Sequence, residues 1–213
     1  MKKAANTTIV AFLNDILDHK QCDTIKELKT KLVKPEHLTV SQVKMLSSYY
    51  SFTFVRNPFD RVLSVYLEKF TKEQINRKYE SLPGAGKASQ AGFASFVSYL
   101  DSGGLYVNRH WWPQVDLLFQ PAEDFSFIGK IENMVEDMKK LLIDNNIDPQ
   151  LAAKLKRPHE KELEKGELRI TNAKKRTSQF YTKKEVETVV RLYKRDFESF
   201  GYSVTPEWFA VDD

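Results

Sequence analysis

An arginine and a serine two helical turns later are the first residues that could do chemistry in this chain. Arg56 follows a run of β-branched and aromatic residues, 51–55, which predicts a short buried parallel strand. Asn57 and Pro58 then predict the cap and first position of a helix that carries Ser64. Because the carboxyl end of a parallel strand meets the start of the next helix, both side chains can converge on one anion above the sheet.

A second candidate anion site lies at the beginning of the chain. Lys3, Ala5 and Asn6 lead into the paired hydroxyls of Thr7 and Thr8, and a helical apolar pattern follows. A lysine, small residues and hydroxyls at a helix N-terminus are typical of a phosphate loop, and Asn6 is suited to a left-handed backbone position. The alternative is a threonine that caps the helix behind a basic terminus. The sequence leaves both interpretations open.

A dense polar and aromatic cluster at 108–114 is the third candidate. In one interpretation His110 is a general base, and Trp111 or Trp112 is a platform for a sugar or a nucleobase. In the other, a buried tryptophan anchors the segment beside a structural histidine. Neither interpretation is favoured by the sequence alone.

The elements that must position these residues can be predicted from hydrophobic periodicity. We expect strands at 51–55 and 125–129, and helices at 7–17, 39–49, 58–70, 93–101, 132–142 and 182–200. The apolar stripe of the helix after Pro58 should face the sheet, with Ser64 off that stripe. Two strand-to-helix units predict an α/β fold with a central parallel sheet flanked by helices, in one domain over 1–213.

The composition narrows the class of protein. The chain has 213 residues, 41% hydrophobic and 29% charged, which fits one globular domain with a substantial core. Its formal net charge of +4 is compatible with an anionic ligand and does not require a nucleic-acid partner. Cys22 is the only cysteine, so neither an intrachain disulfide nor a cysteine-based metal site can form. No apolar run approaches the roughly 18 residues of a membrane span, and we expect a soluble chain without a membrane segment.

Several of these segments resemble the carbohydrate sulfotransferases related to the chondroitin and HNK-1 enzymes of the Golgi, a family that also has bacterial members. The stretch from Arg56 to Arg61, followed by Ser64, is similar to the 3′-phosphate-binding motif of that family. The stretch from Lys3 to Thr8 is similar to its 5′-phosphosulfate loop, with Lys2 in place of the usual proline. Further matches lie at 110–114, 127–132 and 193–202, in the family's order.

The resemblance implies a P-loop-like sulfotransferase fold that moves a sulfonate from 3′-phosphoadenosine 5′-phosphosulfate to a carbohydrate hydroxyl. The transfer would be in-line and metal-free, and it would leave adenosine 3′,5′-bisphosphate. Arg56 and Ser64 would recognise the 3′-phosphate. The 5′-phosphosulfate would be held by the loop residues Lys3, Ala5, Asn6, Thr7 and Thr8, with Lys3 also neutralising charge on the departing oxygen.

The remaining site residues are also implied by the resemblance. His110 would be the catalytic base, with Glu132 as the reserve candidate. The segment 171–181 resembles a late loop that closes over the nucleotide, and Arg176 and Ser178 would be its donor contacts. The expected partner is an oligo- or polysaccharide acceptor, with no nucleic acid, and no oligomeric state is predicted.

A second departure and two rival functions accompany the resemblance. The family has a strand before the 5′ loop, whereas this chain starts at the loop, so we expect the first strand to be missing, replaced, or encoded upstream. One rival is an impaired pseudo-enzyme that binds the nucleotide or a glycan without turnover. The other is a P-loop nucleotide kinase, although no GxxxxGK[ST] loop is present. We expect a bacterial cytoplasmic protein, or a Golgi luminal one if the chain is a trimmed catalytic fragment.

Overall fold

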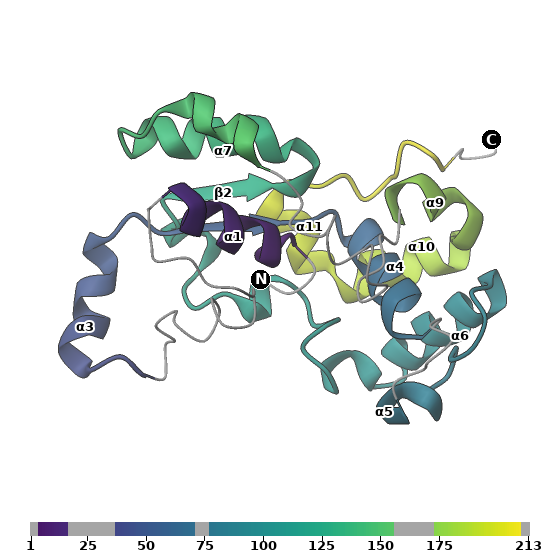
Figure 1. Cartoon of the computed structure of the whole chain (residues 1–213). Helices are drawn as coiled ribbons and strands as arrows, with labels where there is room; N and C mark the ends of the chain where they lie inside the picture. Colours follow the sequence, from purple (N-terminus) through teal and green to yellow (C-terminus); the bar gives the residue numbers. More distant parts are fainter. Residues whose placement is uncertain (1–3, 17–36, 71–76, 156–172, 210–213) are drawn as a thin grey trace. The chain divides into compact units, whose positions relative to one another are not determined.

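The computed structural model describes residues 4–16, 37–70, 77–155 and 173–209, which fall into two compact units (Figure 1). The first unit holds the described residues up to 55 and those from 123 to 155. The second unit holds the described residues from 56 to 122 and from 173 onward. Each unit has its own cluster of buried apolar side chains. A single domain over 1–213 stays a prediction.

A small parallel sheet forms the centre of the first unit. Strand β1 (Phe52–Val55) pairs with strand β2 (Phe127–Lys130), and Phe54 lies opposite Gly129. Both strands overlap the segments predicted from the sequence, and their parallel pairing confirms a mixed helix and sheet fold. In the described part of the chain the sheet has these two strands. Gly129 is required here, because a Cβ at this position would lie 2.5 Å from the ring of Phe54.

The helices of the first unit are α1 (Asn6–Ile16), α3 (Val40–Met45) and α7 (Met134–Asp144), with 3₁₀ helices at Leu46–Ser48, Ile131–Asn133 and Pro149–Lys154. Two of them, α1 and α7, contribute buried residues to the core beside the two strands, whereas α3 has no buried residue (Figure 1). This core joins Ile9 and Phe12 of α1 to Phe54 of the sheet and to Met138 and Leu142 of α7. The helix predicted at 39–49 is confirmed as α3 followed by the 3₁₀ helix Leu46–Ser48. A capping box between Thr39 and Gln42 begins α3.

The second unit is helical in its described residues. It contains α4 (Pro58–Lys69), α5 (Arg77–Glu80), α6 (Gln90–Asp101), α9 (Ala173–Phe180), α10 (Lys183–Leu192) and α11 (Lys194–Phe200). Short 3₁₀ helices lie at Gly104–Tyr106 and Val115–Leu117, and a third, Ala122–Asp124, spans the chain boundary between the units. The core of this unit is rich in aromatic rings that surround α4.

Helix α4 begins as the sequence predicts but is buried differently. The side chain of Asn57 accepts a hydrogen bond from the N–H of Phe59, and Pro58 occupies the first turn. The stripe expected to face the sheet is covered by helices instead: the ring of Phe59 packs against Phe197 of α11, and that of Phe70 against Phe96 of α6. All residues from 58 to 67 are buried, including Ser64, because α4 is enclosed around its circumference.

Two further expectations about helices are wrong. The predicted single helix at 182–200 is two helices, α10 and α11, which meet at Tyr193 with φ −110° and ψ 21°. In the segment predicted as a late loop, residues 173–180 form helix α9. Its buried side chains Ala173, Thr177 and Phe180 recur at helical spacing and belong to one face, so burial of that face explains the helix. Gly201 ends α11 with a left-handed backbone, as predicted.

Candidate functional site

The turn that follows β1 is fixed by a side-chain amide from a distant part of the chain. The backbone N–H of Arg56 donates to Oε1 of Gln114 at 2.9 Å, and Nε2 of Gln114 donates to the carbonyl of Arg56 at 2.8 Å. The amide thus satisfies both backbone groups of this residue, as a neighbouring strand would. Gln114 has no exposed surface. The backbone of Arg56, the first candidate anion-binding residue, is therefore held in place on both its N–H and its carbonyl.

A buried carboxylate holds that glutamine in turn. The oxygens of Asp196 accept from the backbone N–H groups of Gln114 at 2.8 Å and Val115 at 2.9 Å, and Nε2 of Gln114 lies 3.3 Å from the same carboxylate. Burial raises the pKa of the Asp196 carboxyl above its usual value, whereas these hydrogen bonds and the charge of Arg61 oppose that rise. The carboxylate is thus a well-satisfied acceptor inside the second unit.

Arg61 is a fully buried cation that binds the loop carrying His110. Its Nη1 donates to the carbonyl of Trp112 at 2.7 Å and its Nη2 to that of His110 at 3.4 Å. Burial lowers the pKa of the Arg61 guanidinium, and the charge of Arg56 lowers it further, whereas Asp196 raises it. Two guanidinium groups therefore influence each other near the start of α4, and the buried one, Arg61, is occupied by backbone carbonyls.

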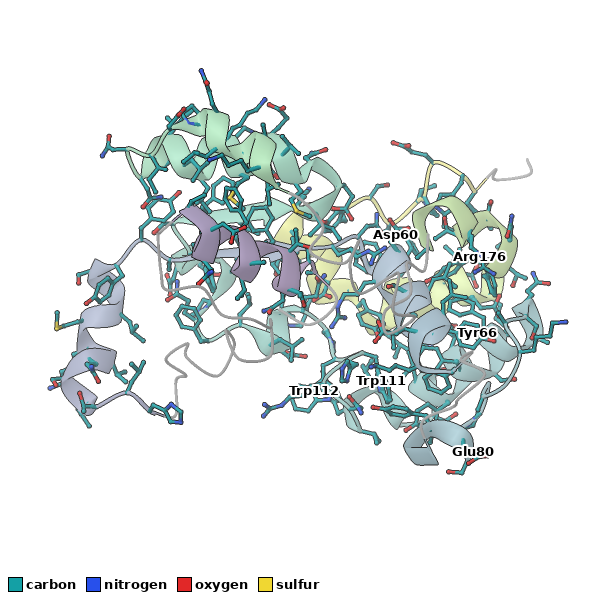
Figure 2. The ribbon with its side chains drawn as sticks, in the orientation of Figure 1. Asp60, Tyr66, Glu80, Trp111, Trp112 and Arg176 are labelled. Carbon is teal, nitrogen blue, oxygen red and sulfur yellow. The ribbon has the colours of Figure 1, made fainter. Side chains whose placement is uncertain are left out.

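The segment 108–115, which we call the His110 loop, separates the roles of its two tryptophans (Figure 2). Trp111 is fully buried, its Nε1 donates to the carbonyl of Gly104 at 2.9 Å, and its own carbonyl accepts from Tyr193 at 2.5 Å. Trp111 is therefore an anchor and not a platform. Trp112 is half-buried, with the guanidinium of Arg109 5.5 Å from its ring centre. Only Trp112 keeps the role of a candidate ligand platform.

The tautomer of His110 follows from its contact with Asn108. Oδ1 of Asn108 accepts from the backbone N–H of His110 at 3.0 Å and lies 2.7 Å from its Nδ1, while Nδ2 of Asn108 donates to the hydroxyl of Tyr79. Because Oδ1 is an acceptor, Nδ1 carries the ring proton of a neutral imidazole. Nε2 is then the proton-accepting nitrogen, which is the state that a general base needs.

The predicted 5′ loop belongs to the first unit and differs from expectation in two ways. The left-handed residue is Ala5, with φ 51°, and not Asn6, which is the first residue of α1. Thr7 and Thr8 lie inside the helix, so the interpretation of either as the N-cap is wrong. A left-handed residue before a helix turns successive N–H groups to one side, and such a concavity binds anions. Lys3 lies outside the described residues.

The other predicted site residues are spread over both units. Ser64 lies on α4, two turns beyond Arg56, and is buried. Glu132 is in the 3₁₀ helix Ile131–Asn133 of the first unit. Arg176 lies on α9 with its guanidinium 5.0 Å from the ring centre of Phe180, and Ser178 is exposed on the same helix. The second unit thus contains five of the predicted site residues, Arg56, Ser64, His110, Arg176 and Ser178, and the roles of all these residues stay predictions.

Comparison with known proteins adds an independent finding. A model described as the sulfotransferase family matches residues 1–203, which is nearly the whole chain. The chain belongs to the sulfotransferase family. The resemblance drawn from the motifs is thereby confirmed. No solved structure matches this chain.

The curated relatives of this chain are named as carbohydrate sulfotransferases. Carbohydrate sulfotransferase 12 of Mus musculus is 34% identical over 128 residues, which cover 50% of this chain and 30% of the relative. Carbohydrate sulfotransferase 14 of Mus musculus is 32% identical over 108 residues, 46% of this chain and 29% of the relative. Carbohydrate sulfotransferase 11 of Mus musculus is 29% identical over 191 residues, 78% of this chain and 50% of the relative. The matches span half or less of the length of these relatives.

The described residues contain no cluster of three His, Cys, Asp or Glu side chains that could hold a metal ion. Within the same ranges, no helix is both long enough and apolar enough to span a bilayer.

Sequence reasoning gave no role to the buried polar residues around the candidate site. They are Arg61, Gln114, Tyr193 and Asp196. All four fall in segments that match family motifs, so their positions could have been found. Their function could not, because only the folded chain shows that they bind one another and the backbone at Arg56 and His110.

Proposed function

We propose that this sulfotransferase transfers a sulfonate from 3′-phosphoadenosine 5′-phosphosulfate to a hydroxyl group of a carbohydrate. The family match and the names of the relatives support the reaction class and the acceptor class. The observation that carries the proposal is the position of Arg56, which follows β1 directly and precedes the cap of α4. Its backbone is held there by the amide of Gln114. This is where a parallel α/β fold binds an anionic ligand.

The chain offers donor groups suited to both phosphate positions of this nucleotide. The planar fork of Arg56 can bind a 3′-phosphate through two hydrogen bonds, and the hydroxyl of Ser64 can add a third. The first N–H groups of α1, after the left-handed Ala5, suit the 5′-phosphosulfate together with Thr7 and Lys3. Arg176 and Ser178 are proposed as further donor contacts. A 3′-phosphate separates this donor from ATP, so Arg56 is the proposed determinant of specificity.

The proposed chemistry is an in-line displacement at sulfur. The acceptor oxygen forms the new S–O bond as the S–O bond to the 5′-phosphate breaks. His110 takes the hydroxyl proton at Nε2, which its contact with Asn108 leaves as the accepting nitrogen. Glu132 is the reserve base. Lys3 and the N-terminus of α1 offset the charge that develops on the departing phosphate oxygen.

Calorimetry tests the donor half of this proposal. Adenosine 3′,5′-bisphosphate should bind more tightly than ATP with magnesium, because only the former carries a 3′-phosphate for Arg56. Tighter binding of ATP would contradict the proposal and favour a nucleotide kinase. Transfer of labelled sulfonate across a panel of glycans tests the second half. We expect at least one glycan to be labelled, and binding of the bisphosphate without any transfer would exclude the enzymatic activity.

A further inference from the structure

The side chain of Gln114 joins the two parts of the second unit that the proposed reaction needs. Its amide binds both backbone groups of Arg56, and its own backbone is part of the His110 loop. These contacts connect residues that lie 58 positions apart in the sequence. A displacement of this amide would therefore shift the backbone from which the Arg56 side chain projects.

The amide has little freedom to move. Gln114 is fully buried, and Asp196 accepts hydrogen bonds from both its backbone N–H and its side-chain Nε2. With Oε1 bound to the Arg56 N–H and Nε2 shared between the Arg56 carbonyl and Asp196, one rotamer satisfies every partner. Such a saturated buried network fixes geometry more strongly than the same contacts would at the surface.

We propose that Gln114 is a positioning residue for donor recognition, which aims the Arg56 guanidinium at the 3′-phosphate, and that Asp196 holds Gln114 in this orientation. The inference rests on the proposed function, because it assigns Arg56 to the 3′-phosphate. It goes beyond that function by making specificity depend on a residue that does not touch the nucleotide. A bidentate contact loses most of its strength when its fork is misdirected, since hydrogen bonds weaken steeply with angle.

The test compares the affinities of the full chain for adenosine 3′,5′-bisphosphate and adenosine 5′-monophosphate by calorimetry. The ratio of the two affinities measures recognition of the 3′-phosphate alone. In the wild type we expect a ratio on the order of a hundredfold, the upper part of the range for hydrogen bonds to charged groups. Gln114→Met keeps the length of the side chain and removes its hydrogen bonds. This variant should lower the ratio to about tenfold or less while leaving the affinity for the monophosphate nearly unchanged.

A double-mutant cycle with Arg56→Ala separates positioning from general damage. If Gln114 acts through Arg56, the substitution Gln114→Met should have no further effect on the ratio once Arg56 is alanine. Val97→Ala, a buried change on α6 away from this network, is the control for loss of stability and should leave the ratio at its wild-type value. Additive effects of the two substitutions in the cycle would overturn the inference.

Gln114→Glu provides a second variant of nearly the same shape. It keeps an acceptor for the Arg56 N–H but, when ionised, loses the donors to the Arg56 carbonyl and to Asp196 and places a second carboxylate beside Asp196, so its ratio should fall at least as far as that of Gln114→Met. A wild-type ratio in either folded variant would overturn the inference while leaving the proposed function intact. If neither variant unfolds cooperatively, Gln114 is needed for the stability of the fold, and that result would also overturn the inference. A wild type that does not distinguish the two nucleotides would instead contradict the proposed function itself.

Discussion

At the scale of single residues, two arginines of one short motif have opposite roles. Arg61 is fully buried and bonded to backbone carbonyls, so its charge is used inside the protein. Arg56 is half-buried, and its backbone groups are occupied by Gln114. The contacts therefore assign Arg61 to the architecture and make Arg56 the candidate for the ligand, although both side chains have the same chemistry.

The role proposed for His110 can be tested by its truncation to alanine. The variant should retain the wild-type affinity for adenosine 3′,5′-bisphosphate, because Arg61 binds the backbone carbonyl of His110 and not its ring. The rate of sulfonate transfer should fall by roughly 10²–10⁴-fold, the usual contribution of a general base. Calorimetry measures the affinity, and steady-state kinetics with labelled donor measures the rate.

Arg191→Ala is the matched control for this prediction, because Arg191 is an exposed residue of α10 that pairs with Asp101 at the surface. It should change neither the affinity nor the rate. Loss of bisphosphate binding in His110→Ala, with no separate defect in transfer, would remove His110 from the role of base. Glu132 would then be the next candidate.

At the scale of elements, helix α4 is the part on which the second unit is built. Its start is set locally, by the Asn57 cap and by Pro58, and its buried circumference is then covered by aromatic residues of the surrounding helices. Helix α4 also binds the 81–89 segment, because the hydroxyl of Tyr66 forms hydrogen bonds with the N–H and the carbonyl of Ser89. A change at the first turn of α4 therefore affects both stability and the adjacent Arg56.

Removing the cap of α4 should have two separable effects. Asn57→Ala should lower the free energy of unfolding by about 1 kcal/mol, because the N–H of Phe59 loses its acceptor. It should also weaken binding of the bisphosphate, since the cap fixes the residue that follows Arg56. Chemical denaturation and calorimetry measure the two effects.

Ser89→Ala is a matched cap deletion on α6, where the serine hydroxyl accepts from the N–H of Gly92. It should cost a similar free energy of unfolding and leave the affinity unchanged. If both cap variants weaken binding equally, the effect on affinity comes from stability and not from the geometry at Arg56.

At the scale of the whole molecule, tyrosine hydroxyls in both units lie in surroundings that disfavour ionisation. In the first unit, burial and then the Asp144 carboxylate, which accepts a hydrogen bond from the phenol, raise the pKa of Tyr50 to about 12. In the second unit, burial is the main cause that raises the pKa of Tyr181 and Tyr193, which donate to the carbonyls of Phe59 and Trp111. The folded chain thus holds these phenols in their neutral form.

The protein should therefore lose stability in alkali. A phenol whose folded-state pKa is raised contributes its full stabilisation below its ordinary pKa near 10, and this stabilisation is lost as the pH rises through the folded value. We expect the free energy of unfolding, measured in urea, to fall from pH 9 towards pH 12. Tyr50→Phe should be less stable at pH 8 and should show a shallower fall. Equal slopes for the variant and the wild type would contradict the assignment of Tyr50.

Much of the fold and part of the site could be predicted from local patterns. The strand before Arg56, the Asn57 cap and the start of α4 depend on residues a few positions apart, and all three are confirmed. The predicted end of the last helix at Gly201 is also confirmed, and it depends on the glycine itself. The division of 182–200 at Tyr193 was not predictable, because it accompanies a hydrogen bond to Trp111, a residue 82 positions away.

The sequence by itself determined the family, the order of the candidate site segments and the residue types able to bind an anion, because each is encoded in short stretches. Only the tertiary structure decided which of these residues are buried and what they hold. The amide of Gln114 reaches Arg56 across 58 positions, and Asp196 reaches Gln114 across 82. Such pairs depend on the tertiary structure, since a buried polar group must find its partner within the fold.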